Sequence, residues 1–122
     1  MAKKILLIED DVYLLNIYAT KLKEAKFEVV TAESGEVGLE LAKKEKPDLI
    51  LLDILFPGKI SGFEVLKSLK ADATMMNIPV LLLTNLKDNK TISEGLKLGA
   101  LGYFTKTDTT PDDIIKSVEN FI

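Results

Sequence analysis

Residues 48–62 read Asp-Leu-Ile-Leu-Leu-Asp-Ile-Leu-Phe-Pro-Gly-Lys-Ile-Ser-Gly, and this stretch decides the fold. Its apolar run at residues 49–52 has no two-residue alternation, which is typical of a strand buried on both faces of a parallel sheet. The run stops at the carboxylate of Asp53. Because Asp is a turn former and a poor strand former, Asp53 could simply end the strand. The alternative is that a buried strand delivers an acid to a functional loop.

Other predicted strands also end on side chains that can take part in chemistry. These strand-end residues are Glu9 and Asp10 after residues 5–8, Thr84 after residues 80–83, and Lys106 after residues 101–105. A further strand at residues 27–31 carries Glu28 and is more polar, as an edge strand would be. The repetition favours a functional interpretation of Asp53.

Amphipathic segments separate the strands. Apolar residues recur at helical spacing in five segments, at about residues 12–26, 34–46, 63–69, 88–99 and 110–122. Five strands alternating with five helices predict an α/β fold, a doubly wound, flavodoxin-like parallel sheet in the strand order 2-1-3-4-5 with helices on both faces. The carboxyl ends of all strands meet along one edge of such a sheet, so we expect the strand-end residues to converge there.

The composition is that of an ordinary globular domain. At 122 residues, with 47% apolar and 29% charged residues, the chain is expected to form one domain over residues 1–122 with no output domain. It has no cysteine, which excludes disulfides and thiolate metal sites. The short apolar run near the amino terminus fits neither a signal peptide nor a membrane span. We therefore expect a cytoplasmic protein without membrane contact.

The charged residues narrow the chemistry further. All 16 basic residues are lysines and the net charge is −3, so direct nucleic-acid binding is not expected. The chain has no histidine, which removes the commonest general base and metal ligand. Carboxylates and lysine must therefore perform any phosphate chemistry.

The predicted strand-end cluster suits a hard divalent cation and a phosphoryl group. Glu9, Asp10 and Asp53 would bring negative charges together, and an all-oxygen site without His or Cys favours Mg²⁺, or Mn²⁺, over zinc. The Thr84 hydroxyl and the Lys106 ammonium could contact a phosphoryl group bonded to Asp53, because phosphoryl transfer depends mainly on positioning and charge neutralisation.

Several short motifs resemble one known family in order and spacing, over the whole chain. They are Ile-Glu-Asp-Asp at residues 8–11, Leu-Leu-Asp at 51–53, Leu-Thr at 83–84 and Gly-Tyr-Phe-Thr-Lys at 102–106. The chain resembles the response-regulator receiver domain of two-component signalling, in its stand-alone form. The resemblance implies the following roles: Asp53 as phosphoacceptor, Asp10 and the Leu55 carbonyl as direct Mg²⁺ ligands, Glu9 as a ligand through water, Thr84 and Lys106 as phosphoryl contacts, and Thr84 and Tyr103 as switch residues.

The resemblance also implies a function. The protein would accept a phosphoryl group from a histidine kinase or histidine phosphotransfer protein and signal by protein contact through the fourth helix, fifth strand and fifth helix. It would be at most a slow autophosphatase, as a monomer or a phosphorylation-dependent dimer. The alternatives are a receiver-like binding module that works without phosphate, and a metal-dependent phosphohydrolase. The second of these typically needs an acid at the position of Leu55.

For several of these residues a purely structural role is the alternative to a functional one. Asp11 is expected to cap the first helix rather than bind metal. Tyr103 could be an ordinary strand aromatic, and Lys106 a solvated lysine. Lys106 precedes Thr107 where the family often has Pro after a cis bond, so either isomer stays open. Leu55 and Leu86 flank Asp53 and Thr84 in sequence and could shield an aspartyl phosphate from water, or pack away from it.

Overall fold

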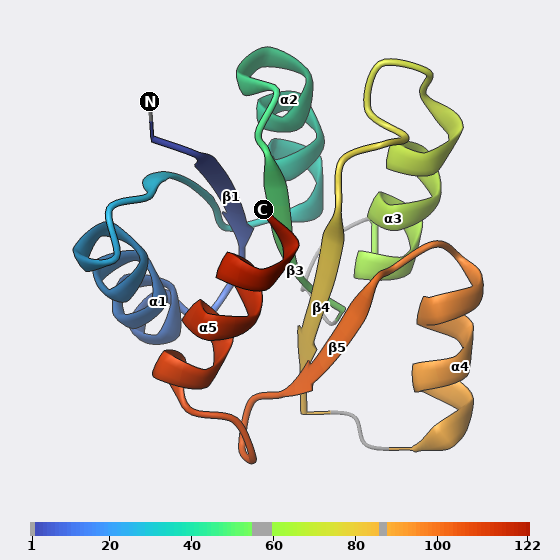
Figure 1. The fold of residues 1–122 in the computed structure, drawn as a ribbon. Helices are drawn as coiled ribbons and strands as arrows, with labels where there is room; N and C mark the ends of the chain where they lie inside the picture. Colours follow the sequence, from blue (N-terminus) through green and yellow to red (C-terminus); the bar gives the residue numbers. More distant parts are fainter. Residues whose placement is uncertain (1, 55–59, 86–87) are drawn as a thin grey trace.

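A five-stranded parallel sheet forms the centre of the molecule. The computed structural model describes residues 2–54, 60–85 and 88–122. The strands are β1 (Lys4–Ile8), β2 (Glu28–Ala32), β3 (Leu49–Asp53), β4 (Val80–Thr84) and β5 (Gly102–Thr105). They pair in the order β2-β1-β3-β4-β5, every neighbouring pair being parallel (Figure 1). The predicted α/β class and strand order are confirmed.

Helices cover both faces of the sheet. They are α1 (Val12–Glu24), α2 (Gly35–Glu45), α3 (Gly62–Ala71), α4 (Asn89–Lys97) and α5 (Pro111–Phe121). In Figure 1, α1 and α5 lie on one side of the sheet, while α2 and α3 lie on the other. Two apolar clusters mirror this division, one joining the strands to α1 and α5 and the other joining them to α2 and α3.

The strands divide their side chains between these clusters by simple alternation. In β3, Leu49 and Leu51 belong to the cluster under α1 and α5, whereas Ile50 and Leu52 belong to the cluster under α2 and α3. Successive side chains of a strand point to opposite faces, so a strand covered on both sides must be apolar throughout. This explains the unbroken apolar run from which the fold was predicted.

Helix ends follow local capping chemistry, which moves some predicted boundaries by one or two residues. The first helix ends at Glu24 and not at Lys26, since Lys26 takes a left-handed conformation with φ of 74°. The third helix begins at Gly62, one residue before the predicted start, because Ser61 caps it, its hydroxyl accepting from the backbone N–H of Glu64. Thr110 caps α5 in the same way, its hydroxyl accepting from the backbone N–H of Asp113.

None of the described helices is a candidate membrane span. Within residues 2–54, 60–85 and 88–122, no helix is both long enough and apolar enough to span a bilayer.

Candidate functional site

The strand-end residues meet at the carboxyl edge of the sheet, as predicted. Asp53 and Thr84 are the last residues of β3 and β4, Glu9 and Asp10 follow β1, and Lys106 follows β5. The topology places β3 between β1 and β4, so Asp53 lies at the centre of the group. Ion pairs join Lys106 to both Glu9 and Asp53, which shows that residues separated by almost a hundred positions meet here.

Three carboxylates form the acidic part of the site. One oxygen from each of Glu9, Asp10 and Asp53 lies within 4.8 Å of the others. Glu9 and Asp53 are buried, while Asp10 is partly exposed. Burial and the hydrogen bond with Asp53 raise the pKa of Glu9 to about 8, and the neighbouring Lys106 works in the opposite direction. The raised pKa favours the protonated form of Glu9, because water cannot fully solvate another negative charge at this site.

Lys106 supplies the positive charge inside this cluster. Its ammonium donates to Oε1 of Glu9 and, over 3.0 Å, to Oδ2 of Asp53. Burial lowers the pKa of Lys106, but hydrogen bonds and the charges of Glu9 and Asp53 outweigh this effect, so its pKa is raised. Lys106 is thus not a solvated surface lysine.

The backbone around Asp53 is arranged closely. Oδ1 of Asp53 accepts from the N–H of Ile54 over 2.7 Å, so each carboxylate oxygen of Asp53 has a donor. The start of α3 packs against this turn, where the N–H of Gly62 donates to the Ile54 carbonyl over 2.8 Å. A Cβ at position 62 would lie 2.2 Å from the carbonyl oxygen of Asp53. Position 62 therefore requires glycine, a constraint that the sequence analysis did not recognise.

Thr84 and Tyr103 complete the neighbourhood on the β4 and β5 side. Thr84 is buried, and its carbonyl accepts from the backbone N–H of Lys106 over 2.9 Å. This hydrogen bond fixes the backbone of Lys106 beside β4. Tyr103 is half-buried and packs against the cluster under α2 and α3. Burial and the charge of Asp88 raise the pKa of Tyr103. The packing that could make Tyr103 an ordinary strand aromatic is present, and its role as a switch stays a prediction.

Tyr18 is a neighbour of the site that the sequence analysis did not single out. It is buried in α1, and burial raises its pKa. The charges of Lys106, Glu9 and Asp53 also act on its phenol. A tyrosine at a core position where leucine would suffice was the available signal.

Other predictions around the site have separate outcomes. Asp11 caps α1, accepting from the backbone N–H groups of Tyr13 and Leu14, as expected. No cis peptide bond occurs in the part of the chain that the structure describes, so the bond after Lys106 is trans. Leu55, expected to offer its carbonyl to Mg²⁺, and Leu86, expected near the pocket mouth, lie outside the described residues.

The donor set fits a hard divalent cation. Three carboxylates converge within a few ångströms, and the chain offers neither His nor Cys. Carboxylate oxygens are the ligands that Mg²⁺ and Mn²⁺ prefer. One ammonium cannot neutralise three carboxylates, so the site retains an excess of negative charge for a metal ion to offset.

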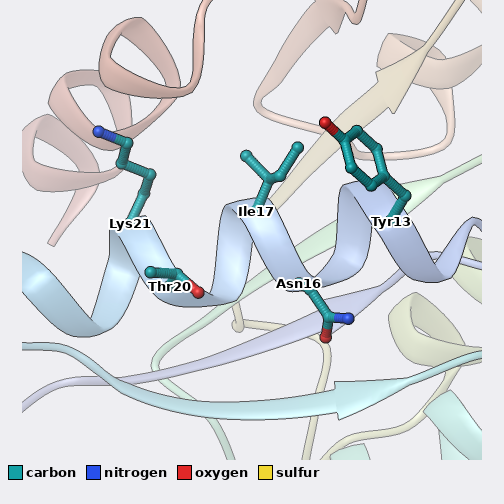
Figure 2. Close-up of a pocket in the computed structure, with 5 residues that line it drawn as sticks. All are labelled: Tyr13, Asn16, Ile17, Thr20 and Lys21. Atoms are coloured by element: carbon teal, nitrogen blue, oxygen red, sulfur yellow. The ribbon is translucent and has the colours of Figure 1, made fainter.

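A hollow lies on the outer side of α1, apart from the acids. Tyr13, Asn16, Ile17, Thr20 and Lys21 line this hollow (Figure 2). The Lys21 ammonium extends toward α5, where it lies 3.7 Å from a carboxylate oxygen of Asp112. The hollow contains no residue of the acidic cluster and adds nothing to its chemistry.

Comparison with known proteins gives a consistent result. Residues 5–119 match the family described as response regulator receiver domain. Among curated proteins, the chain is 40% identical over 106 residues to the alkaline phosphatase synthesis transcriptional regulatory protein PhoP of Bacillus subtilis, covering 87% of this chain and 43% of that protein. It is 35% identical to the phosphate regulon transcriptional regulatory protein PhoB of Pseudomonas aeruginosa, covering 87% and 46%. The chain thus spans less than half the length of these relatives.

Solved structures agree in fold. The chemotaxis protein CheY4 of Vibrio cholerae superposes with a TM-score of 0.92 at 27% identity, covering 100% of both chains. A putative response regulator from Chloroflexus aurantiacus superposes with a TM-score of 0.91 at 29% identity, covering 99% of this chain and 98% of that one.

Proposed function

Because this chain belongs to the response-regulator receiver domain family, we propose that it is a phosphorylation-dependent switch of a two-component phosphorelay. Asp53 accepts a phosphoryl group from a phosphohistidine on a partner histidine kinase or histidine phosphotransfer protein. The observation that carries this proposal is the position of Asp53, at the centre of the acidic cluster with the Lys106 ammonium 3.0 Å from Oδ2.

The transfer requires a nucleophile and charge neutralisation. A carboxylate oxygen of Asp53 attacks phosphorus, the phosphorus–nitrogen bond of the donor breaks, and the imidazole leaves with that electron pair. An acyl phosphate remains on Asp53. A carboxylate nucleophile carries no proton to be removed, so the absence of histidine from the chain is no obstacle.

Side chains around Asp53 are suited to the charge of the phosphoryl group. Lys106 provides an ammonium with three donor hydrogens, and Thr84 provides a hydroxyl at the end of β4. Glu9, Asp10 and Asp53 would hold Mg²⁺ or Mn²⁺, which would supply further positive charge to the phosphoryl oxygens. By family resemblance, the Leu55 carbonyl would be a further ligand.

The signal then passes by protein contact. The new charge on Asp53 attracts the Thr84 hydroxyl and the Lys106 ammonium, and Tyr103 on β5 changes its position in response. The surface formed by α4, β5 and α5 is thereby altered, and a downstream protein binds to the altered surface. In this proposal the protein works in the cytoplasm as a switch, with at most slow hydrolysis of its own phosphate.

Acetyl phosphate with Mg²⁺, followed by intact mass measurement, tests the proposal. We expect the addition of one phosphoryl group in the parent and none in Asp53→Asn. Asp48→Asn is the matched control, because Asp48 precedes the opposite end of β3, where its carboxylate accepts from the backbone N–H of Lys4. This control should be phosphorylated like the parent. A mass increase that survives Asp53→Asn would refute the assignment of the phosphoacceptor.

A further inference from the structure

The buried carboxylate of Glu9 makes its polar contacts within the site. Oε1 accepts from the Lys106 ammonium, and Oε2 accepts from the backbone N–H of Asp11 over 3.4 Å. The Glu9 side chain is 0% exposed and that of Lys106 is 10% exposed. A glutamate is rarely buried this completely unless it is paired with a cation. The pairing therefore restricts the orientation of both side chains.

Glu9 and Lys106 follow strands that are not neighbours in the sheet. Glu9 comes after β1 and Lys106 comes after β5, with β3 and β4 between them. Adjacent strands are about 4.8 Å apart, so the two backbones are separated by roughly 14 Å. Both side chains must extend to meet across this distance, and an aspartate at position 9 would be one methylene shorter. The contact thus depends on the length of the glutamate side chain.

The same ammonium contacts the proposed phosphoacceptor. Lys106 lies 3.0 Å from Oδ2 of Asp53, and its backbone is attached to β4 through the Thr84 carbonyl. A lysine side chain has four rotatable bonds. A contact with its ammonium restricts these bonds far more than a hydrogen bond to its backbone does. Glu9 provides that contact from the side of β1.

We propose that Glu9 is a positioning residue that holds the Lys106 ammonium beside Asp53 before a metal ion or phosphoryl group arrives. This role is separate from holding an ion through water, which needs negative charge at position 9 but does not need Lys106. Positioning instead requires an oxygen acceptor with the reach of a glutamate side chain. The inference deepens the proposed function. It rests on that function for one consequence only: the ammonium already lies where the phosphoryl oxygens would be.

The ammonium signals of lysine side chains test this role in the absence of metal. In ¹⁵N-labelled protein with chelator, Lys106→Met identifies the Lys106 resonance by its loss. We expect that resonance in the parent to exchange slowly with water and to be shifted from those of surface lysines. Glu9→Asp, which keeps the carboxyl group but shortens the side chain by one methylene, should lose the shift and the protection.

Glu45→Asp is the matched control, since Glu45 forms an ion pair with Lys4 rather than Lys106. It should leave the Lys106 resonance unchanged. A Lys106 resonance that is the same in Glu9→Asp as in the parent would overturn the proposal. If a variant does not fold, the parent decides, because a Lys106 ammonium that exchanges as fast as surface lysines also overturns it. Failure of acetyl phosphate to modify Asp53 would refute the proposed function and leave this result intact.

Discussion

The Lys106 ammonium lies 3.0 Å from Oδ2 of Asp53, and the same ammonium pairs with Glu9. One internal cation therefore serves two buried acids. Among the described residues, Asp10, the partly exposed member of the group, takes no part in these ion pairs and adds further negative charge. The arrangement suits a site that must be stable without a metal ion and must still attract a divalent cation.

Removing the ammonium should destabilise the metal-free protein. Lys106→Met keeps most of the side-chain volume but leaves Glu9 and Asp53 without their counter-ion, and we expect a loss of about 3 kcal/mol in the free energy of unfolding. Thermal melts in chelator measure this loss. Mg²⁺ should raise the melting temperature more in this variant than in the parent. Lys4→Met, which breaks the more exposed pair with Glu45, should have a much smaller effect. Equal losses in the two variants would contradict the importance of the Lys106 pairs.

Mg²⁺ should stabilise the fold through Asp10. Binding to the native state alone adds about 1.4 kcal/mol at an ion concentration ten times the dissociation constant. We expect Asp10→Asn to abolish the Mg²⁺-dependent rise in melting temperature. Asp11→Asn should retain it, because Asp11 caps α1 and asparagine caps helices equally well. If Asp10→Asn keeps the full rise, the ion binds elsewhere.

The stability of the metal-free protein should fall as pH increases from about 4.5 to about 8. The pKa of Glu9 is raised in the folded state, so the native protein keeps a proton that the unfolded chain has already lost. Within that window folding takes up a proton, and stability decreases with rising pH. The raised pKa of Lys106 affects stability only at higher pH. Chemical denaturation across this range should show a shallower decrease in Glu9→Gln than in the parent. Parallel curves would contradict the assignment to Glu9.

Gly62→Ala should destabilise the protein by about 2 to 4 kcal/mol, because the added methyl group meets backbone atoms of Asp53 and Ile54 that cannot move aside easily. Gly95→Ala is the comparison, since the group it meets is a terminal methyl of Leu82. Denaturant melts should give the larger loss for Gly62→Ala. Equal losses would show that the turn after Asp53 can relax.

Tyr103 should change its surroundings on phosphorylation if it is the switch residue. Fluorotyrosine labelling gives three signals, and the other two tyrosines are internal references, Tyr13 being exposed and Tyr18 buried. Each signal is identified by a Tyr→Phe variant. We expect acetyl phosphate with Mg²⁺ to shift the Tyr103 signal more than that of Tyr13. An unchanged Tyr103 signal in fully phosphorylated protein would leave this residue with a packing role only.

The sequence by itself determined the fold class and which side chains meet at the carboxyl edge of the sheet. The apolar runs ending at Ile8, Leu52 and Leu83 required a sheet covered on both faces, because a strand exposed on one side would alternate. A parallel sheet brings its carboxyl ends to one edge, so the convergence of Asp53 and Lys106 followed from topology alone. Helix ends were less predictable, since a single left-handed residue such as Lys26 moves a boundary.

Only the tertiary structure decided how these side chains are paired. The sequence placed Lys106 near the acids, but it could not show that the ammonium reaches Glu9 across β3 and β4. Nor could it show that α3 approaches the end of β3 so closely that position 62 must be glycine. Both features depend on distances between elements far apart in the chain. Such distances are set by the packing of the whole sheet and its helices, and no local pattern of residues records them.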